Sequence, residues 1–531
     1  MSRDDAMGSA EFQRLAGEYG VVPVGRVLPA GGAAAVSLHR APAAGRPGTF
    51  LLESASPAHP GEGWSFLTPG ARAVLSERDG AAVWSGTRPP GQVDGADPVT
   101  ALRDFQRTVR APALPWLPPF SGGLVGYLGY DLCVRGLGVH PAGPDPLGLP
   151  ELALLWTTEV VALDHRHDRV VLIVNVLTDG CREQRATDYR RALARLDELE
   201  RSVAAARDLA AADLRGPARA RPGPAAVSDP GLTPRERAGF EERLRRAASR
   251  VDAGEARQVV LSHRFTRHGP VTSGGLYASM RERMPGSYLY RLDLDGLLPD
   301  GSSLALVGSG PEAVATVRAG EVRVRPVAGT RPRGATEAAD RAAAAGLLAD
   351  PKERAEHLML VELAQEDLAS VCRPGSVRVE TLMEVERYST LMHLRSTVTG
   401  RLADEYGPVD ALLACTPAGT VSGTPRAAAA RVIDELEPVR RGVYGGAVGY
   451  VDHTGNADAV IAIRAAVLRG GAVHVQAGAG VVAGSDLAAE AQEAERKAGG
   501  VLGAVAVASA GPATTPAPAV AAAGAAGAPV S

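Results

Sequence analysis

Two pairs of glutamates are the residues best suited, by type and spacing, to do chemistry. Glu353 and Glu356 lie three positions apart, as do Glu490 and Glu493, and Lys497 follows four positions after the second pair. Residues at these spacings share one side of a helix, so each pair would present two carboxylates together. Two such helices can converge on one magnesium ion, a hard cation that prefers oxygen ligands and shares them with anionic substrates. Spacing alone leaves open that both pairs are solvated helix faces.

The first glutamate pair lies on a helix with a clear start signal. Asp350 can accept hydrogen bonds from first-turn amides, Pro351 suits the first helical position, and Glu353 suits the positive end of the helix dipole. We expect one helix of roughly twenty residues. Leu360 and Leu363 supply its expected apolar face, which the two glutamates share. Carboxylates on an apolar face are costly to bury unless a cation meets them, and this favours the metal interpretation.

The second pair lies on a predicted final helix, capped by Ser485 and reaching about Val505. Groups suited to binding an anion occur nearby in the sequence. Arg464 stands at a predicted strand end, Tyr444 lies in a glycine-rich turn, and residues 478–480 read Gly-Ala-Gly. An arginine fork together with backbone amides of a glycine-rich turn suits a small carboxylate ligand. Each of these residues, taken singly, is equally explained as part of a turn or a sheet edge.

Composition bounds the remaining possibilities. The chain has 531 residues, 45% hydrophobic and 22% charged, with a formal net charge of −3. These values are typical of a soluble globular protein, and the absence of basic runs interleaved with aromatics argues against a nucleic-acid surface. No apolar stretch is long enough to suggest a membrane span. The four cysteines are widely spaced without a Cys-x-x-Cys pair, so neither a disulfide framework nor a zinc site is indicated. We expect a cytoplasmic enzyme or binding protein.

The element pattern predicts an α+β fold, because long strand pairs alternate irregularly with helices. Helices are expected over residues 188–206 and 427–436, and one begins at the capping box of Thr233. Strands are expected over residues 49–52, 122–130, 152–163, 170–177, 258–262, 304–308, 322–326, 377–385, 396–402, 445–451, 459–468 and 473–477.

Composition shifts divide the chain into four parts. Residues 214–232 are dense in Pro, Gly and Ala and are expected to form a linker. They separate an N-terminal region, 1–213, from a catalytic region, 233–507. Residues 508–531 consist mainly of Ala, Pro, Gly and Thr, cannot bury a core, and are expected to be disordered.

Five ordered motifs closely resemble the large subunit of anthranilate synthase, and the resemblance extends from about Phe50 to Ala504. The motifs are RPVAGTRPRG (residues 325–334), LLADPKERAEHLML (347–360), YSTLMH (388–393), PAGTVSG (417–423) and QAGAGVV (476–482). The chain is thereby identified as a member of the chorismate-utilising enzyme superfamily. The resemblance implies an α+β fold of two antiparallel-rich sheets in a sandwich with flanking helices, and an active site in a cleft.

The resemblance also assigns roles, residue by residue. It implies magnesium bound by Glu353, Glu356, Glu490 and Glu493, with Glu356 and Glu493 as the principal ligands. Catalytic roles fall to Glu312 as the general acid, His393 and Thr420. Substrate binding falls to Gln258, Ala328, Tyr444, Arg464, Gly478, Ala479, Gly480 and Lys497. The implied reaction is nucleophilic addition at C2 of chorismate with loss of the 4-hydroxyl, which needs an acid at the leaving oxygen.

Two positions indicate the nucleophile. Related enzymes that add water carry a lysine where this chain has Gln258, and those that aminate at C4 carry a nucleophilic lysine in place of Ala328. Neither lysine is present, so ammonia attacking C2 fits best. No amidotransferase module is seen in the sequence, so ammonia is expected from solution or from a separate glutamine amidotransferase subunit.

Departures from the family pattern bear on the product. An Arg-Asn pair is replaced by Gln365 and Glu366, and residues 63–66 lack an Arg-Tyr pair of the tryptophan feedback site. We therefore expect release of the aminated intermediate, 2-amino-2-deoxyisochorismate, for antibiotic biosynthesis. The alternative is anthranilate synthase component I, which continues to anthranilate and pyruvate; His393 and Thr420 favour it.

Two further hypotheses compete with these products. One is a catalytically inactive paralogue, against which the intact glutamates argue, and the other is a water-using isochorismate or salicylate synthase. No nucleic-acid or membrane partner is expected, and a homo-oligomer is left open.

Overall fold

The structure is a computed structural model that describes residues 7–40, 47–54, 60–215, 231–284, 288–387 and 391–510. Most of the predicted linker, 214–232, and of the predicted tail, 508–531, lies outside these residues. The division of the chain into regions therefore stays a prediction. Helix α5 (Arg182–Arg215) runs into the start of the predicted linker and is longer at both ends than the predicted 188–206.

The first of two antiparallel sheets has eleven strands and contains strands from both halves of the chain. In order across the sheet they are β1 (Val21–Pro29), β9 (Arg169–Leu177), β8 (Glu159–Asp164), β3 (Pro60–Leu67), β2 (Thr49–Ser54), β11 (Tyr288–Asp293), β12 (Leu304–Gly310), β21 (Ala465–Arg469), β22 (Ala472–Val482), β10 (Gln258–His268) and β18 (Gly423–Thr424).

The second sheet also combines strands from both halves of the chain. Its order is β15 (Val327–Pro332), β17 (Leu391–Arg401), β14 (Glu321–Val324), β13 (Ala313–Arg318), β20 (Ala457–Ile461), β19 (Ala447–Asp452), β6 (Gly123–Leu128), β7 (Leu152–Thr157), β4 (Ala73–Arg78) and β5 (Ala81–Gly86), and β16 (Arg378–Arg387) pairs with β17.

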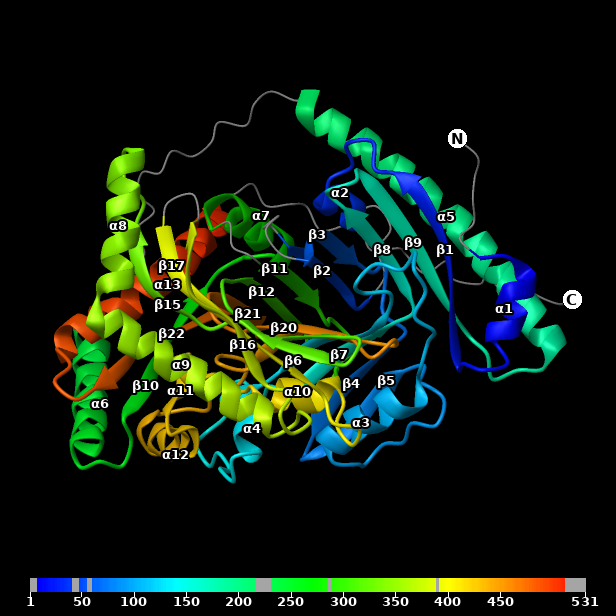
Figure 1. The fold of residues 1–531 in the computed structure, drawn as a ribbon. Coiled ribbons are helices and arrows are strands. Elements are labelled where there is room, and N and C mark those ends of the chain that lie inside the picture. The colour runs from blue at the N-terminus through cyan, green and yellow to red at the C-terminus, as the bar shows by residue number, and fades with distance from the viewer. Residues whose placement is uncertain are drawn as a thin grey trace, which may run out of the picture.

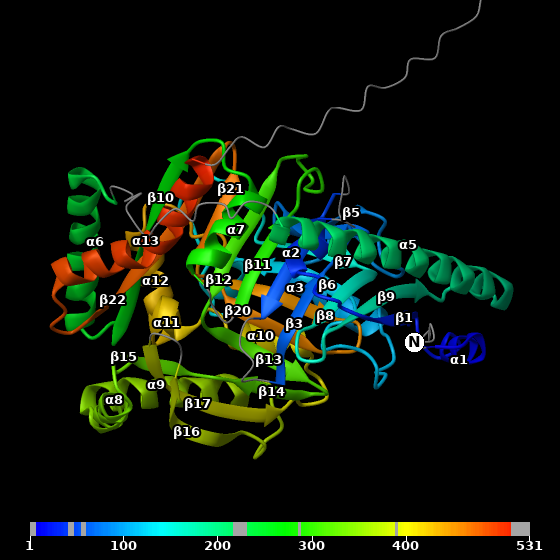
Figure 2. The ribbon, with the colours of Figure 1, turned by 90° about the horizontal axis from the view of Figure 1, so that it is seen from above.

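The two sheets pack against each other and share a hydrophobic core. Phe50, Tyr290 and Leu306 of the first sheet are buried in one cluster with Tyr127 and Tyr450 of the second. Helices cover the outer faces, as Figures 1 and 2 show: α5 packs along β9, α7 against β12 and α13 against β22, while α9 packs on β15 and β17. The predicted α+β sandwich with flanking helices is confirmed.

The helices that cover the sheets are short or moderate in length apart from α5 and α13. They are α1 (Ser9–Leu15), α2 (Ala35–Arg40), α3 (Pro98–Thr108), α4 (Tyr130–Arg135), α6 (Pro234–Asp252), α7 (Ser273–Arg283), α8 (Glu337–Ala349), α9 (Pro351–Ala369), α10 (Pro408–Ala414), α11 (Gly419–Ser422), α12 (Arg426–Leu436) and α13 (Leu487–Ala510). Within the described residues, no helix is both long and apolar enough to cross a membrane.

Two segments that the sequence suggested as single strands are broken, because the chain passes from one sheet to the other. Residues 152–163 form β7 in the second sheet and β8 in the first, with the break at Thr158. Residues 459–468 divide likewise into β20 and β21. The apolar pattern continues through both breaks since each side of the break is buried in a core, and pattern alone therefore could not show them.

Two of the three predicted helix caps are present. The Thr233 capping box is present, and Asp350 accepts hydrogen bonds from the amides of Lys352 and Glu353 at the start of α9. The predicted cap at Ser485 is wrong. Asp486 caps α13 instead, accepting from the Ala488 and Ala489 amides at 3.0 and 3.2 Å.

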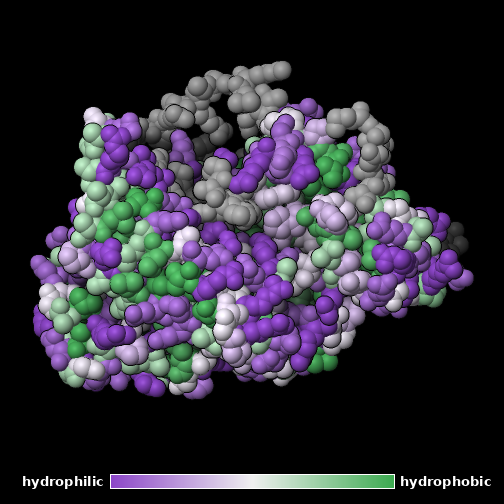
Figure 3. All heavy atoms as spheres, in the orientation of Figure 1, coloured by the Kyte–Doolittle hydropathy of each residue, from purple (hydrophilic) through white to green (hydrophobic). Residues whose placement is uncertain are grey.

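Hydrophobic side chains gather on one side of the molecule. In Figure 3 they concentrate toward α8 and β17, while hydrophilic side chains prevail elsewhere on that face. The exposed leucines Leu348, Leu358, Leu382 and Leu391 belong to α8, α9, β16 and β17. This side is therefore the more apolar part of the face that carries α9.

Candidate active site

Glu312 and Arg464 are placed where the chain passes between the two sheets. Pro311 and Glu312 connect β12 to β13, and residues 462–464 connect β20 to β21. Backbone hydrogen bonds join the two passages: the Ser309 amide donates to the Arg464 carbonyl at 3.1 Å, and the Ile461 amide donates to the Glu312 carbonyl at 3.0 Å. We call this pair of passages the seam; it holds an acid and a guanidinium side by side.

Arg464 has an unusual backbone conformation at the seam. Its φ angle is +48°, in the left-handed region that residues other than glycine seldom adopt. Such a conformation costs about 1 kcal/mol or more and persists where the surrounding structure holds it, often at functional sites. The side chain is exposed. Burial raises the pKa of Glu312 and lowers that of His393, and the charge of Arg464 acts to lower both pKa values. Arg464 therefore lies close enough to Glu312 and His393 for its charge to act on both.

Glu312 has the environment of a general acid. Burial raises the pKa of its carboxyl above the usual range, and the Thr420 hydroxyl, Arg464 and Lys497 act in the opposite direction. The Thr420 hydroxyl donates to Oε2 of Glu312 at 3.1 Å from the short helix α11. A carboxyl with a raised pKa retains its proton closer to neutral pH, so it can deliver that proton to a leaving group.

The glycines of β22 form a flat floor beside this acid. A Cβ atom on Gly478 would lie 3.1 Å from the hydroxyl oxygen of Tyr444, and one on Gly480 would lie 2.8 Å from Nε2 of Gln258. Lys497 of α13 donates from Nζ to the Gly478 carbonyl at 3.3 Å. Glycine is needed because these side chains lie directly on the strand. Burial raises the pKa of Tyr444 to about 12, so its hydroxyl stays protonated and can donate.

Ala479 lies between the two glycines and is fully buried, in the core beneath α13. Successive residues of a strand point to opposite faces, so the Ala479 side chain turns away from the floor. Any contact that Ala479 makes with a ligand on the floor is therefore made by its backbone.

His393 lies on β17 beside a bulge in β15. The pairing of these strands shifts register at Gly329, whose φ is +70°. His393 Nδ1 donates to the Gly329 carbonyl at 3.1 Å and lies 3.0 Å from the Thr330 hydroxyl oxygen. Burial lowers the pKa of His393, helped by the charge of Arg464. The ring is thus neutral at neutral pH, with the proton on Nδ1 and Nε2 as its acceptor nitrogen.

Gly329 also connects this strand with the first glutamate pair. A Cβ atom on Gly329 would lie 3.0 Å from Oε2 of Glu353, so that carboxylate rests on the bulge next to His393. Ala328 immediately precedes the bulge and pairs with Leu394. Its methyl group offers no nucleophile at this position.

The face of α9 that carries the glutamates is not its core face. The sequence suggested Leu360 and Leu363 as core residues, but both are only half-buried, and the buried stripe is His357, Val361, Ala364 and Leu368. Leu363 instead packs toward α11, since a Cβ atom on Gly419 would lie 2.7 Å from its Cδ2 atom. Glu353 and Glu356 share the Leu363 side of the helix. The glutamate face is therefore turned toward Thr420.

His357 is a residue that the sequence alone did not single out. It is fully buried, and its Nε2 atom lies 2.6 Å from the hydroxyl oxygen of Ser396 on β17. Ser396 also accepts from the Met383 amide at 2.9 Å. This polar contact fixes α9 on the sheet that carries His393. Thr330, which contacts His393, was missed as well; Thr330 and His357 lie inside the family motifs at 325–334 and 347–360, but no role was assigned to either.

The second glutamate pair lies on the first turns of α13, opposite the start of α9. Burial raises the pKa of Glu490, as does the neighbouring Glu493, while Lys497 and Lys352 of α9 lower it. Because Lys352 acts on Glu490, the starts of the two helices approach each other. Glu493 pairs with Arg496 at 2.5 Å and with Lys497 at 3.7 Å.

The four glutamates do not form a closed metal cluster. Among the described residues, no group of three or more His, Cys, Asp or Glu side chains is close enough to hold a metal ion. Glu356 is exposed, and Glu493 keeps its two cationic partners. The donor set still fits magnesium in its chemistry, because it consists of carboxylates on two facing helix ends, and hard cations prefer such oxygens.

The departures noted in the sequence lie away from these groups. Glu366 is exposed and Gln365 half-buried, and both follow the glutamate pair on another side of α9. Leu52, Ser54, Trp64 and Tyr288 still line one cavity, so the change at residues 63–66 does not remove that pocket.

The chain is similar to several known proteins. The family of chorismate binding enzymes matches residues 50–503. The chain is 43% identical over 503 residues to anthranilate synthase component 1 of Mycolicibacterium smegmatis, covering 94% of this chain and 93% of that protein. Anthranilate synthase component I of Streptococcus pneumoniae TIGR4 superposes with a TM-score of 0.65 at 31% identity, covering 83% of this chain and 92% of that one.

A more distant structure shares the fold. The menaquinone-specific isochorismate synthase of Escherichia coli superposes with a TM-score of 0.64 at 19% identity, covering 92% of this chain and 95% of that one.

Proposed function

The chain belongs to the family of chorismate binding enzymes, and we propose that it acts as anthranilate synthase component I. It would aminate chorismate at C2 and then eliminate pyruvate to give anthranilate. The observation that carries the proposal is the group formed by Glu312, Thr420 and Arg464, an acid with a raised pKa beside a cation at the seam. The proposal takes its substrate from the family and its product from the names of the relatives.

The substrate would lie on the glycine floor of β22. Chorismate is a dianion, and Arg464 together with the Tyr444 hydroxyl and the amides near Gly480 offers donors for its carboxylates. Lys497, whose Nζ contacts the Gly478 carbonyl, adds a second positive charge at the opposite edge of the floor. This arrangement would orient the ring so that its 4-hydroxyl faces Glu312.

Amination then proceeds in a balanced step. Ammonia forms a bond at C2, both ring double bonds shift by one position, and the C4–oxygen bond breaks while Glu312 gives its proton to the leaving oxygen, which departs as water. Gln258 lies over Gly480 and offers no base to activate water, which favours ammonia as the nucleophile. We propose that the ammonia comes from a separate glutamine amidotransferase or, in its absence, from solution.

Magnesium is the cation that this donor set suits. Glu353, Glu356, Glu490 and Glu493 would hold it, directly or through water. When bound, it would neutralise a substrate carboxylate and fix the position of the ring. Binding would require Glu493 to exchange Arg496 or Lys497 for the metal as its partner.

Elimination of pyruvate needs a base for the proton on C2. His393 is neutral because burial lowers its pKa, and its Nδ1–H is directed to the Gly329 carbonyl. Its Nε2 atom is thus the nitrogen able to accept that proton while the enolpyruvyl C–O bond breaks and the ring becomes aromatic. The relatives named as anthranilate synthase component 1 support this outcome better than release of the aminated intermediate for antibiotic biosynthesis.

Product analysis tests the proposal. Purified protein incubated with chorismate, magnesium and ammonium should give anthranilate and pyruvate in equal amounts. Accumulation of 2-amino-2-deoxyisochorismate without pyruvate would instead support the release hypothesis. Turnover without any ammonia source would indicate a water-using enzyme, and no turnover at all an inactive paralogue.

A further inference from the structure

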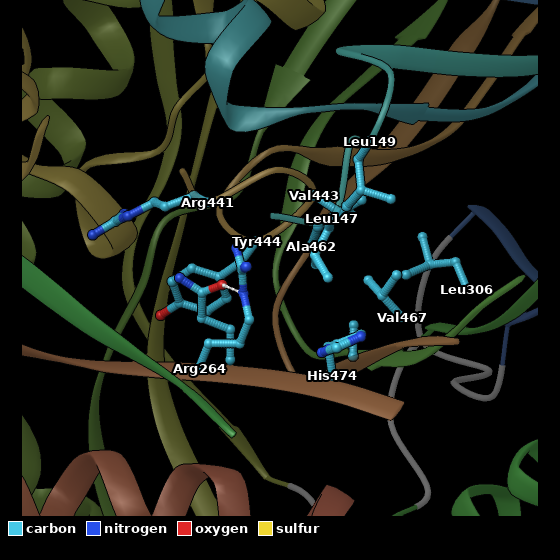
Figure 4. A pocket seen from close by; sticks show the side chains of 12 residues that line it. Leu147, Leu149, Arg264, Leu306, Arg441, Val443, Tyr444, Ala462, Val467 and His474 are labelled. Carbon is cyan, nitrogen blue, oxygen red and sulfur yellow. Dashed lines mark hydrogen bonds between the residues drawn. The ribbon is translucent and has the colours of Figure 1, made fainter. Parts of the chain in front are cut away.

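A basic cavity lies at the edge of β10, outside the group of residues assigned to chorismate. Its volume is about 370 Å³, and it lies between the edge of β10, helix α6 and the segment that follows α12. Side chains able to donate hydrogen bonds to an anion form part of its lining: Arg243, His263, Arg264, Thr266, His474 and Gln476. A narrower cavity shares Arg264, His474 and Gln476 and is also lined by Tyr444, and Figure 4 shows its lining side chains.

Neither arginine of this lining forms an ion pair with any residue that the structure describes. Arg264 donates from Nη2 to the Arg440 carbonyl and from Nε to Oε1 of Gln476 at 3.3 Å, which are both neutral acceptors. Arg243 lies over the ring of Phe240 and has its Nη2 atom 3.4 Å from His263 Nδ1. Half-buried guanidinium groups without a counter-charge are costly, because desolvation is not offset.

Two buried polar atoms here also lack hydrogen-bond partners within the described part of the chain. They are Nε of Arg243 and Nε2 of His263. Native structures satisfy most buried polar atoms, so an orphaned pair in one cavity wall indicates a missing ligand. Burial lowers the pKa of Arg243 and of Arg264, and it lowers the pKa of His263 to about 4. An anion between these side chains would favour their charged forms and so offset the desolvation that lowers these pKa values.

Glu437, whose carboxylate lines the cavity, already accepts hydrogen bonds from other residues. Glu437 Oε1 accepts from the Ser262 amide at 2.7 Å, from the Ser262 hydroxyl at 2.8 Å and from Arg441 Nη2 at 2.6 Å. Its other oxygen accepts from Arg441 Nε at 3.0 Å. Glu437 therefore pairs directly with Arg441, and it acts on Arg243 and Arg264 only from a distance, as Asp145 and Asp131 also do on Arg264.

The strand edge adds a backbone donor. The Ser262 amide points away from β22, since it donates to Glu437. By the two-residue repeat of a strand, the amide of Arg264 points to the same edge, toward the cavity.

From this geometry we propose that the cavity binds a small organic or inorganic dianion, held by Arg243 and Arg264 with His263 and His474 as further donors. Two guanidinium groups on either side of a strand edge match an oxyanion of charge −2, since arginine forks bind carboxylate and phosphate oxygens in pairs. The enclosed volume suits a compact ligand such as phosphate or a short dicarboxylate. The site is distinct from the glycine floor, because Tyr444, Gly478 and Gly480 are not among the residues that line the cavity.

Calorimetric titration of the full chain with inorganic phosphate, and separately with malonate, tests the proposal. Saturable binding of one ion per chain is expected, and Arg243→Gln and Arg264→Gln should each weaken it by about 10-fold or more, because each removes a charge-assisted donor pair. The matched control is Arg245→Gln, an exposed arginine of the same helix that pairs with Glu242 outside the cavity. It should bind as the unaltered chain does. The tighter of the two ions identifies phosphate or carboxylate as the preferred class.

Two results would overturn the proposal: no saturable binding of either ion, or equal weakening in Arg243→Gln and Arg245→Gln, which indicates general charge attraction. A third variant locates the ion. Arg464→Gln should bind phosphate and malonate as tightly as the unaltered chain, and a loss there would place the ion at the seam and refute a separate site. Thermal unfolding of each variant identifies misfolding, and Arg264→Gln decides the question if Arg243→Gln fails to fold.

Discussion

The hydroxyl of Thr420 lies 3.1 Å from Oε2 of Glu312 and donates to it, although the two residues are 108 positions apart in the chain. The contact joins α11 to the seam between the sheets. It favours the ionised form of a carboxyl whose pKa burial raises. The two effects on the pKa of Glu312 oppose each other. Their balance can be tested through the pH dependence of turnover.

The first prediction concerns the alkaline limb of the rate profile. Turnover requires protonated Glu312, so kcat should fall as pH rises through its raised pKa. Thr420→Val removes a hydrogen bond that lowers this pKa, and the limb should move to higher pH. Glu312→Gln should lower kcat by roughly 100-fold to 10,000-fold, the usual contribution of a general acid. The measurement is kcat against pH at saturating chorismate.

A matched control for this profile is Ser422→Ala. Ser422 lies on the same short helix, and its hydroxyl donates to the Ala418 carbonyl at 2.9 Å. Its profile should match that of the unaltered chain. An unchanged limb in Thr420→Val would show that the hydroxyl does not act on the acid.

The second prediction separates amination from elimination. His393→Gln keeps a hydrogen-bonding side chain beside Gly329 but loses the basic nitrogen, so chorismate consumption should continue while anthranilate formation falls about 100-fold. The aminated intermediate should accumulate, and mass analysis of the product mixture would detect it. Equal loss of chorismate consumption and of anthranilate formation would contradict a role for His393 confined to the second step.

The sequence predicted helix starts well because their signals are local. Asp350 and Thr233 each stand next to the amides that they cap, and both caps are present. The strand breaks that create the seam could not be predicted in the same way. Arg464 adopts a left-handed conformation without a glycine to mark it, and the flanking strands remain apolar on both sides.

The wrong core face of α9 has a related cause. A histidine was counted as polar, yet His357 is fully buried because Ser396 lies within hydrogen-bonding distance from a strand 39 positions away. Hydrogen-bond partners of this kind are set by the tertiary structure, so no periodic pattern in the sequence reveals them. The glutamate spacing and the family motifs named the candidate residues, whereas the structure shows how Glu353, Gly329 and His393 meet.

The third prediction concerns magnesium and does not depend on activity. A cation bound only by the folded chain stabilises it, by about 2.7 kcal/mol when the cation concentration is 100 times its Kd, and this raises the unfolding temperature. Adding magnesium chloride should therefore raise the unfolding temperature of the unaltered chain in a saturable way, and EDTA should reverse the rise. Glu356→Gln and Glu493→Gln should each abolish the magnesium response.

The control for that measurement is Glu366→Gln, because Glu366 is exposed on another side of α9. It should keep the full magnesium response. A response that survives in both Glu356→Gln and Glu493→Gln would place any bound magnesium elsewhere.

The fourth prediction uses the glycine floor to separate binding from folding. In Gly480→Ala the new methyl group meets Nε2 of Gln258 at 2.8 Å, the far end of a flexible side chain that can move. We expect a nearly unchanged unfolding temperature but a KM for chorismate raised by about 10-fold, since the displaced amide of Gln258 takes up space that the substrate would occupy.

In Gly478→Ala the methyl group meets the Leu261 carbonyl oxygen at 2.5 Å. Because this oxygen belongs to the backbone and cannot move aside easily, that variant should lose about 1–3 kcal/mol of stability. Gly499→Ala, on α13 with nothing within 4 Å of its Cβ position, is the control and should keep both values or gain stability. Thermal unfolding and steady-state kinetics on the three variants check the prediction, which fails if Gly480→Ala leaves KM unchanged.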